Sequence, residues 1–133
     1  MIVHVPRDVK INVGRIGTLS FARGLYAYVG SALGPGGLKA RILRHLSNNK
    51  KKFWHIDYLL EQSHVVAVII IEKSKKLECV IAREFLGRGV DMVKGFGCSD
   101  CRCPSHLFRI EHVNDVIKVV KTLGLPFSIL WVR

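Results

Sequence analysis

The sequence has few of the features that secreted or membrane proteins need. Its longest apolar run, Val65–Ile71, has seven residues, whereas a helix needs about 20 to cross a bilayer. No basic segment leads into an apolar stretch near the first residue, so no secretory signal is predicted. Of the four cysteines, three crowd into six residues, which is not the framework of a secreted disulfide domain. We therefore expect a soluble cytoplasmic protein.

Acidic residues are scarce as well. Asp and Glu number 10 against 21 Lys and Arg, which gives a formal net charge of +11. An excess this large on a small domain indicates a polyanionic partner, most often nucleic acid, and a solvated lysine-rich surface is the alternative. With 133 residues, 49% of them apolar, and with no repeat or low-complexity segment, the chain is expected to form one domain over residues 1–133.

Strand-like and helix-like patterns alternate along the chain. They predict a layered α/β (α+β) domain in which a small, mostly antiparallel sheet is flanked by helices. We expect Ile11–Val13 to pair with the first strand or with Leu25–Gly30. Strands are predicted at 2–5, 11–13, 25–30, 65–71, 107–110 and 127–132, and helices at 37–46, 53–62, 77–86 and 113–123.

The most informative segment runs from Gly24 to His45. It begins with a strand that carries Tyr28, turns at the glycine-rich stretch 34–37, and continues as a helix with Arg41 and His45. Residues four apart on a helix are neighbours on one side, so Arg41 and His45 should project together. A phenol at a strand end that faces such a pair is typical of a site that handles phosphate.

Several blocks in this order resemble the GIY-YIG nuclease superfamily, and within it the small Uri-type branch, which is often fused to endonuclease III. The family's opening Gly-x-Tyr is not visible here. Its tyrosine would fall at or before Met1, or the domain works without it, with His4 nearby. The matching blocks are Tyr28-Val29-Gly30, the segment 31–38 followed by Arg41, Arg44 and His45, then Trp54–Leu60, Glu78-Cys79, and 95–101 through 105–107.

The resemblance implies a metal-dependent endonuclease and assigns roles to individual residues. Glu78 would bind Mg²⁺ or Mn²⁺, although an acid at a helix start also favours the helix dipole. Arg41 would contact the phosphate and Tyr28 would act as general base or orient the water, unless it is a core tyrosine. His45 and His55 would orient the water or protonate the leaving oxygen, although single histidines are more often structural. We expect Asp57 to orient His55 or an arginine.

The cysteine-rich loop supplies ligand types for a metal. Cys98, Cys101, Cys103 and His106 lie within nine residues, and thiols with an imidazole are the ligands of tetrahedral zinc. Zinc sites usually combine ligand pairs from separate turns, so we favour a metal-free loop that these residues order beside the active face, over structural zinc. A disulfide is a further alternative.

Basic residues near these blocks are candidates for contacts with the nucleic-acid backbone. Such contacts give affinity without sequence readout. Phe53 and Trp54 would stack on unpaired bases or, for Trp54, pack under the 37–46 helix. The candidates for backbone contact are Lys50, Lys51, Lys52, Arg44 and Arg102, with Lys94 beside them.

The sequence therefore predicts a metal-dependent DNA endonuclease that cuts single-stranded or structured DNA, with RNA as an alternative substrate. A non-catalytic nucleic-acid-binding domain on the same scaffold, without the first tyrosine, is the main alternative. A metal-binding partner module that acts through the cysteine loop is a third.

Overall fold

The computed structural model describes residues 1–30, 37–47, 54–71, 77–98 and 102–132. Some sequence predictions fall outside these ranges. They are the glycine turn at 34–36, Lys50, Lys51, Lys52, Phe53 and Cys101.

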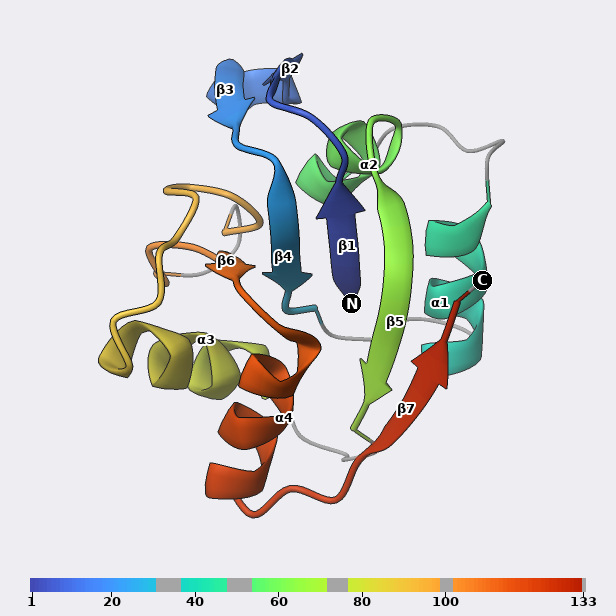
Figure 1. Cartoon of the computed structure of the whole chain (residues 1–133), viewed down its shortest axis with the longest axis vertical. Coiled ribbons are helices and arrows are strands. Elements are labelled where there is room, and N and C mark those ends of the chain that lie inside the picture. The colour runs from blue at the N-terminus through green and yellow to red at the C-terminus, as the bar shows by residue number, and fades with distance from the viewer. Residues whose placement is uncertain (31–36, 48–53, 72–76, 99–101, 133) are drawn as a thin grey trace.

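A five-stranded antiparallel sheet forms the centre of the fold (Figure 1). Its spatial order is β6-β4-β1-β5-β7, so β1 lies in the middle and β7 at one edge. The α+β architecture predicted from the sequence is confirmed. The strands are β1 (Ile2–Val5), β4 (Gly24–Tyr28), β5 (His64–Ile70), β6 (Leu107–Ile110) and β7 (Ser128–Trp131).

Four α-helices in the described ranges flank this sheet. Figure 1 shows α3 and α4 together at one side of the sheet and α1 at the opposite side, beyond β5 and β7. None of the helices described is long and apolar enough to span a membrane. Their bounds are α1 Gly37–Leu46, α2 His55–Leu60, α3 Glu78–Gly87 and α4 Val113–Thr122.

The prediction for Ile11–Val13 is wrong. Ile11 belongs to β2 (Val9–Asn12), which pairs with β3 (Thr18–Phe21) in a separate two-stranded sheet, with Ile11 opposite Leu19. A 3-10 turn at Gly14–Ile16 joins the two strands, and the Val13 N–H donates to the Gly17 carbonyl at 2.8 Å. Gly17 has φ of 84°, which favours glycine, so the chain reverses before it can reach the central sheet.

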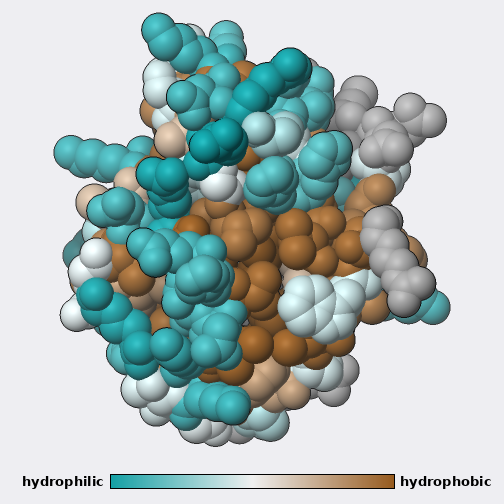
Figure 2. All heavy atoms as spheres, viewed as in Figure 1, coloured by the Kyte–Doolittle hydropathy of each residue, from teal (hydrophilic) through white to brown (hydrophobic). Residues whose placement is uncertain are grey.

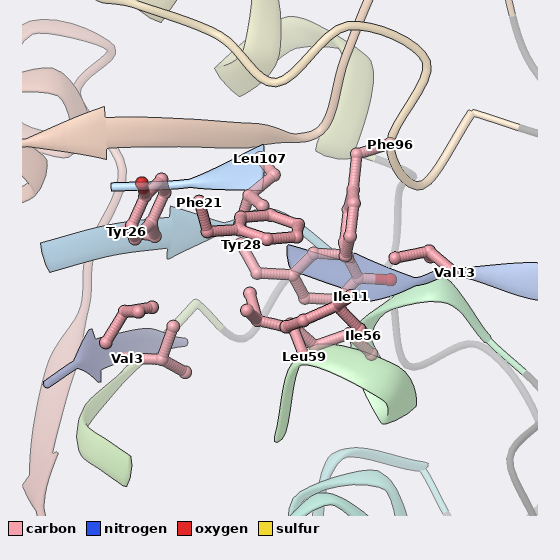
Figure 3. Packing of buried hydrophobic residues seen from close by; sticks show 11 residues of the cluster. Val3, Ile11, Val13, Phe21, Tyr26, Tyr28, Ile56, Leu59, Phe96 and Leu107 are labelled. Carbon is pink, nitrogen blue, oxygen red and sulfur yellow. The ribbon is translucent and has the colours of Figure 1, made fainter. Parts of the chain in front are cut away.

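Alternation along the strands sends side chains to two separate cores. From β4, Tyr26 and Tyr28 enter one core with Val3, α2 and Phe96 (Figure 3). Ala27 enters the other core, where α3 and α4 pack. We call the first the tyrosine face and the second the helix-pair face. His4 alternates with Val3 and Val5 of the tyrosine face, so it points to the opposite side from Tyr28 and cannot stand in for a missing tyrosine.

Not all apolar surface is buried. Figure 2 shows apolar side chains gathered over the sheet between α4 and α1, with hydrophilic side chains above and to the left. On the edge strand β7, Leu130 and Trp131 are exposed. Single exposed apolar residues are ordinary on protein surfaces.

Candidate active site at the end of strand β4

Tyr28 is the last residue of β4 and is buried, with 8% of its surface exposed. Its backbone pairs with Met1 in both directions: the Tyr28 N–H donates to the Met1 carbonyl at 2.8 Å, and the Met1 amino group donates to the Tyr28 carbonyl at 3.0 Å. Burial lowers the pKa of that amino group to about 5. The Tyr28 ring meets Phe96 and His45 edge-on, with centroids 6.2 Å apart in each case. Tyr28 is thus fixed from several sides.

Tyr26, two residues before Tyr28 on β4, has a structural role. Its hydroxyl donates to the Ala22 carbonyl at 2.7 Å, and its ring packs edge-on against Phe21. Burial raises the pKa of Tyr26, which keeps the phenol protonated. Tyr26 is therefore a core tyrosine with a satisfied hydroxyl.

Arg41 and His45 of α1 are neighbours, as their spacing predicted, and both lie beside Tyr28. The Arg41 Nε–H donates to His45 Nε2 at 3.3 Å. A Cβ placed on Gly30 would stand 3.1 Å from Tyr28 Cε2 and 3.2 Å from Arg41 Nη2. The phenol ring and the guanidinium therefore approach the same point in space. A side chain at position 30 would be in tight contact with both groups.

Trp54 supports the two arginines of α1. The Arg41 guanidinium carbon lies 3.8 Å from the centroid of the Trp54 ring, and that of Arg44 lies 4.6 Å from it. His45 also packs on this ring, with centroids 5.7 Å apart. The alternative in which Trp54 packs under the helix is thus confirmed. Stacking uses the face of a guanidinium, so the N–H groups at its edge remain directed away from the ring.

Asp57 partners an arginine, as predicted. This fully buried carboxylate accepts two hydrogen bonds from Arg44, at 2.9 Å and 2.8 Å, and one from the Trp54 backbone N–H at 2.8 Å. The hydrogen bond to Asp57 raises the pKa of Arg44. Arg44 is thus committed to a bidentate ion pair inside the protein, and its charge helps to position α1 against α2.

His55 binds the protein backbone. Its Nδ1 accepts the Gly97 N–H at 2.8 Å, and its ring packs edge-on against Phe96 with centroids 5.6 Å apart. Burial lowers the pKa of His55, which favours the neutral ring that this acceptor role requires. Gly97 in turn lies against Tyr28, because its Cβ would be 3.2 Å from Tyr28 Cε1. His55 thus positions the segment that borders the phenol.

Glu78 is the first residue of α3, as the sequence predicted for the acidic block. Its Oε2 atom is buried and has no hydrogen-bond partner among the described residues. The next residue, Cys79, contacts His106, with 3.9 Å between Sγ and Nε2. His106 lies across Gly97 from Tyr28, since the Gly97 Cβ position is 3.1 Å from His106 Cβ. The first turn of α3 therefore reaches the segment beside Tyr28.

The loop cysteines do not act as one group in the part of the chain described. The Cys98 thiol donates to the Phe96 carbonyl at 3.1 Å. Cys103 and His106 instead gather with Cys79, which the sequence placed in the acidic block without a role. Arg102 and Lys94 are exposed, as contacts to a nucleic-acid backbone require.

The described residues thus define an α+β domain with a phenol, a guanidinium and an imidazole converging at the end of a strand. The chain belongs to the family described as Domain of unknown function DUF123, whose model matches residues 1–127. A search of curated proteins gave no match, and a search of solved structures gave none.

Proposed function

We propose that the chain is a metal-dependent nuclease that hydrolyses phosphodiester bonds in DNA, with single-stranded or structured DNA as its substrate. Its blocks resemble those of the Uri-type GIY-YIG nucleases, and we place its action in the cytoplasm. The observation that carries the proposal is the approach of Tyr28 and Arg41 to one point beside Gly30. The edge of the Tyr28 ring and the Arg41 guanidinium thus border one small space, so both side chains can contact a phosphate group bound there.

Arg41 supplies the phosphate contact in this proposal. The Trp54 ring and His45 Nε2 fix its guanidinium, so little side-chain entropy is lost when it binds. The edge N–H groups can then donate to two phosphoryl oxygens. His45 accepts from Arg41 through Nε2, so this nitrogen carries no proton, and His45 acts as a positioning residue for the guanidinium.

Glu78 is the residue that would hold the metal. One carboxylate oxygen of Glu78 is buried and has no hydrogen-bond partner in the described ranges, which costs free energy of folding. A hard divalent cation would supply the missing partner. When bound, Mg²⁺ or Mn²⁺ supplies positive charge for the phosphoryl oxygens and lowers the pKa of coordinated water. In this proposal Tyr28 acts as a phenolate that takes a proton from the attacking water. The positive charge of Arg41 stabilises that phenolate.

The first test is cleavage of single-stranded, duplex and branched oligonucleotides with Mg²⁺ or Mn²⁺, and with EDTA. Glu78→Gln keeps the size of the side chain and removes its charge, so nicking should collapse while DNA binding survives. Glu84→Gln on the same helix is the matched control. The Glu84 carboxylate forms an ion pair with Arg88, with 3.4 Å between Oε1 and Nε, and takes no part in the proposed site. Full cleavage by the Glu78→Gln variant would show that Glu78 does not hold the metal.

Arg41→Lys tests the phosphate contact. The ammonium keeps the charge and loses the bidentate fork, so turnover should fall far more than affinity. Arg88→Lys is the control for a general effect of losing one guanidinium. Equal losses of turnover and affinity in the Arg41→Lys protein would make Arg41 an ordinary binding residue.

One observation favours a second candidate, a nucleic-acid-binding domain without catalysis. The family's opening motif would place its tyrosine at or before Met1, and strand β1, which follows, carries no tyrosine. This alternative predicts DNA binding that neither metal converts into cleavage, in the wild-type protein and in both variants alike.

A further inference from the structure

Two thiols and an imidazole converge beside the candidate active site. Ligand atoms of Cys79, Cys103 and His106 all lie within 4.8 Å of one another. They come from three separate places in the chain: the first turn of α3, the end of the cysteine loop, and the residue before β6. The proposed nuclease chemistry uses none of these three side chains.

The spacing fits one tetrahedral ion. Bonds of about 2.3 Å to sulfur and about 2.0 Å to nitrogen place tetrahedral ligand atoms about 3.5–3.8 Å apart. The Cys79 Sγ and His106 Nε2 atoms are 3.9 Å apart, so closure onto an ion needs small movements. Thiolates with imidazole select a borderline-soft cation such as Zn²⁺ over Mg²⁺.

The backbone of His106 is held in place before any ion binds. His106 is 4% exposed, and its backbone is fixed on both sides, because its N–H donates to the Phe96 carbonyl at 2.8 Å and its carbonyl accepts the Val29 N–H at 2.9 Å. The neighbouring Ser105 hydroxyl donates to the Val93 carbonyl at 2.6 Å. Cys79 lies in the first turn of α3, so the helix fixes its backbone.

We propose that Cys79 Sγ, Cys103 Sγ and His106 Nε2 bind one zinc ion. Water or another ligand completes the tetrahedron, as in other sites with three protein ligands. The ion ties the start of α3 to the segment that enters β6, and this contact holds Glu78 beside the Tyr28 site. The zinc site does not depend on the proposed nuclease activity, and its test needs no substrate.

The test is metal analysis of full-length protein purified without added zinc. We expect about one zinc per chain in the wild type, and loss of most of it in the Cys79→Ser variant. The matched control is Cys98→Ser, because the Cys98 thiol donates to the Phe96 carbonyl and lies outside the cluster. That variant should keep its zinc. Chelation should lower the Tm of the wild type and of the Cys98→Ser protein, and leave the Tm of the Cys79→Ser protein unchanged.

Cobalt substitution keeps the proposal testable if the Cys79→Ser protein does not fold. Cobalt-loaded wild type should show sulfur-to-cobalt charge-transfer absorption, whereas a site without thiolates would not. Three results would overturn the proposal: wild type without zinc, zinc retained after Cys79→Ser but lost after Cys98→Ser, or a thiol titration that finds Cys79 and Cys103 joined in a disulfide.

Discussion

The same strands send side chains to both faces of the central sheet, but different kinds of segment cover the two faces. On the helix-pair face, two ten-residue helices cover an apolar core in which Phe85 and Phe108 stack with centroids 4.9 Å apart. On the tyrosine face, a six-residue helix, a β-hairpin and the loop around Phe96 cover the sheet. Buried polar groups cluster there, among them Asp57 and His106. The helices of the helix-pair face thus bury apolar side chains, while α1, α2 and the irregular segments bring polar side chains together on the tyrosine face.

The largest loss of stability is expected on the helix-pair face. Phe108 is fully buried, and Phe108→Ala removes its stacking on Phe85 and leaves a cavity under α3 and α4. We expect the free energy of unfolding to fall by about 3–5 kcal/mol. Urea unfolding of the variant measures this. Phe108→Leu is the control and should cost less, since most of the volume stays. A loss below about 1 kcal/mol would mean that this face does not carry the stability.

Two aspartates allow the faces to be compared at the same structural position. Asp57 caps α2 through the Trp54 N–H, and Asp115 caps α4 through the His112 N–H at 2.9 Å. Asp57 is fully buried and also binds Arg44, whereas Asp115 is only half-buried. Asp57→Asn should therefore cost about 2–3 kcal/mol, because a charged hydrogen-bond network loses its carboxylate.

Asp115→Asn is the matched control and should cost about 0.5–1 kcal/mol, the usual range for a lost cap. Urea unfolding of both variants gives the difference. Equal losses would show that the bond between Asp57 and Arg44 adds nothing beyond capping, and the contrast between the faces would then not extend to their buried polar groups.

Local patterns were sufficient to predict most of the fold. Helical periodicity placed α1 at its observed bounds and α4 within a residue, and a four-residue spacing made Arg41 and His45 neighbours. Ile11 shows where this reasoning failed. Its apolar character predicted a strand correctly, but partner choice depends on the turn at Gly14–Ile16, which the alternation of side chains does not encode.

The contacts that assemble the site were harder to predict, because they join distant segments. Cys79 meets His106 across 27 residues, and nothing in the spacing of the loop cysteines indicates this. The close approach at Gly30 likewise depends on how α1 docks on β4. In the sequence, the only indication of this close approach was that Gly30 follows a buried strand. A glycine at that place indicates an ordinary turn equally well.

The glycines of the Phe96 loop give a finer test of the tyrosine face. Gly97 has φ of 75° and Gly95 has φ of 81°, so alanine at either position is strained by about 1–2 kcal/mol. A Cβ at Gly97 would also press on His106 Cβ and on the Tyr28 ring, whereas a Cβ at Gly95 would meet no atom within 4 Å. Gly97→Ala should therefore lower the free energy of unfolding more than Gly95→Ala does, as measured by urea unfolding. In assays of the proposed DNA cleavage, it alone should reduce turnover. If the two variants gave the same unfolding free energy and the same cleavage rate, the loop would have adjusted to the added Cβ without moving Tyr28.

The smallest expected effect is a pH dependence that comes from His55. Its pKa is lowered in the folded protein by burial, so between that value and the ordinary 6.5 the unfolded chain binds more protons than the folded one. The contribution to stability is therefore complete above 6.5 and is lost as the pH falls through the window below it. Protonation also removes the Nδ1 lone pair that accepts the Gly97 N–H.

His55→Asn separates this effect from the other histidines. The Asn side-chain oxygen can accept the same N–H and does not titrate, so the variant should lose the part of the pH dependence that His55 contributes. The measurement is urea unfolding of both proteins at several pH values from 7.5 down to 5, with the difference in unfolding free energy between them plotted against pH. Because the remaining histidines are common to both proteins, their titration cancels in this difference. A difference that stays constant over the whole range would show that His55 has the same pKa in the folded and unfolded states. The hydrogen bond from Gly97 would then add nothing to stability, and the packing of Phe96 would hold this side of the tyrosine face instead.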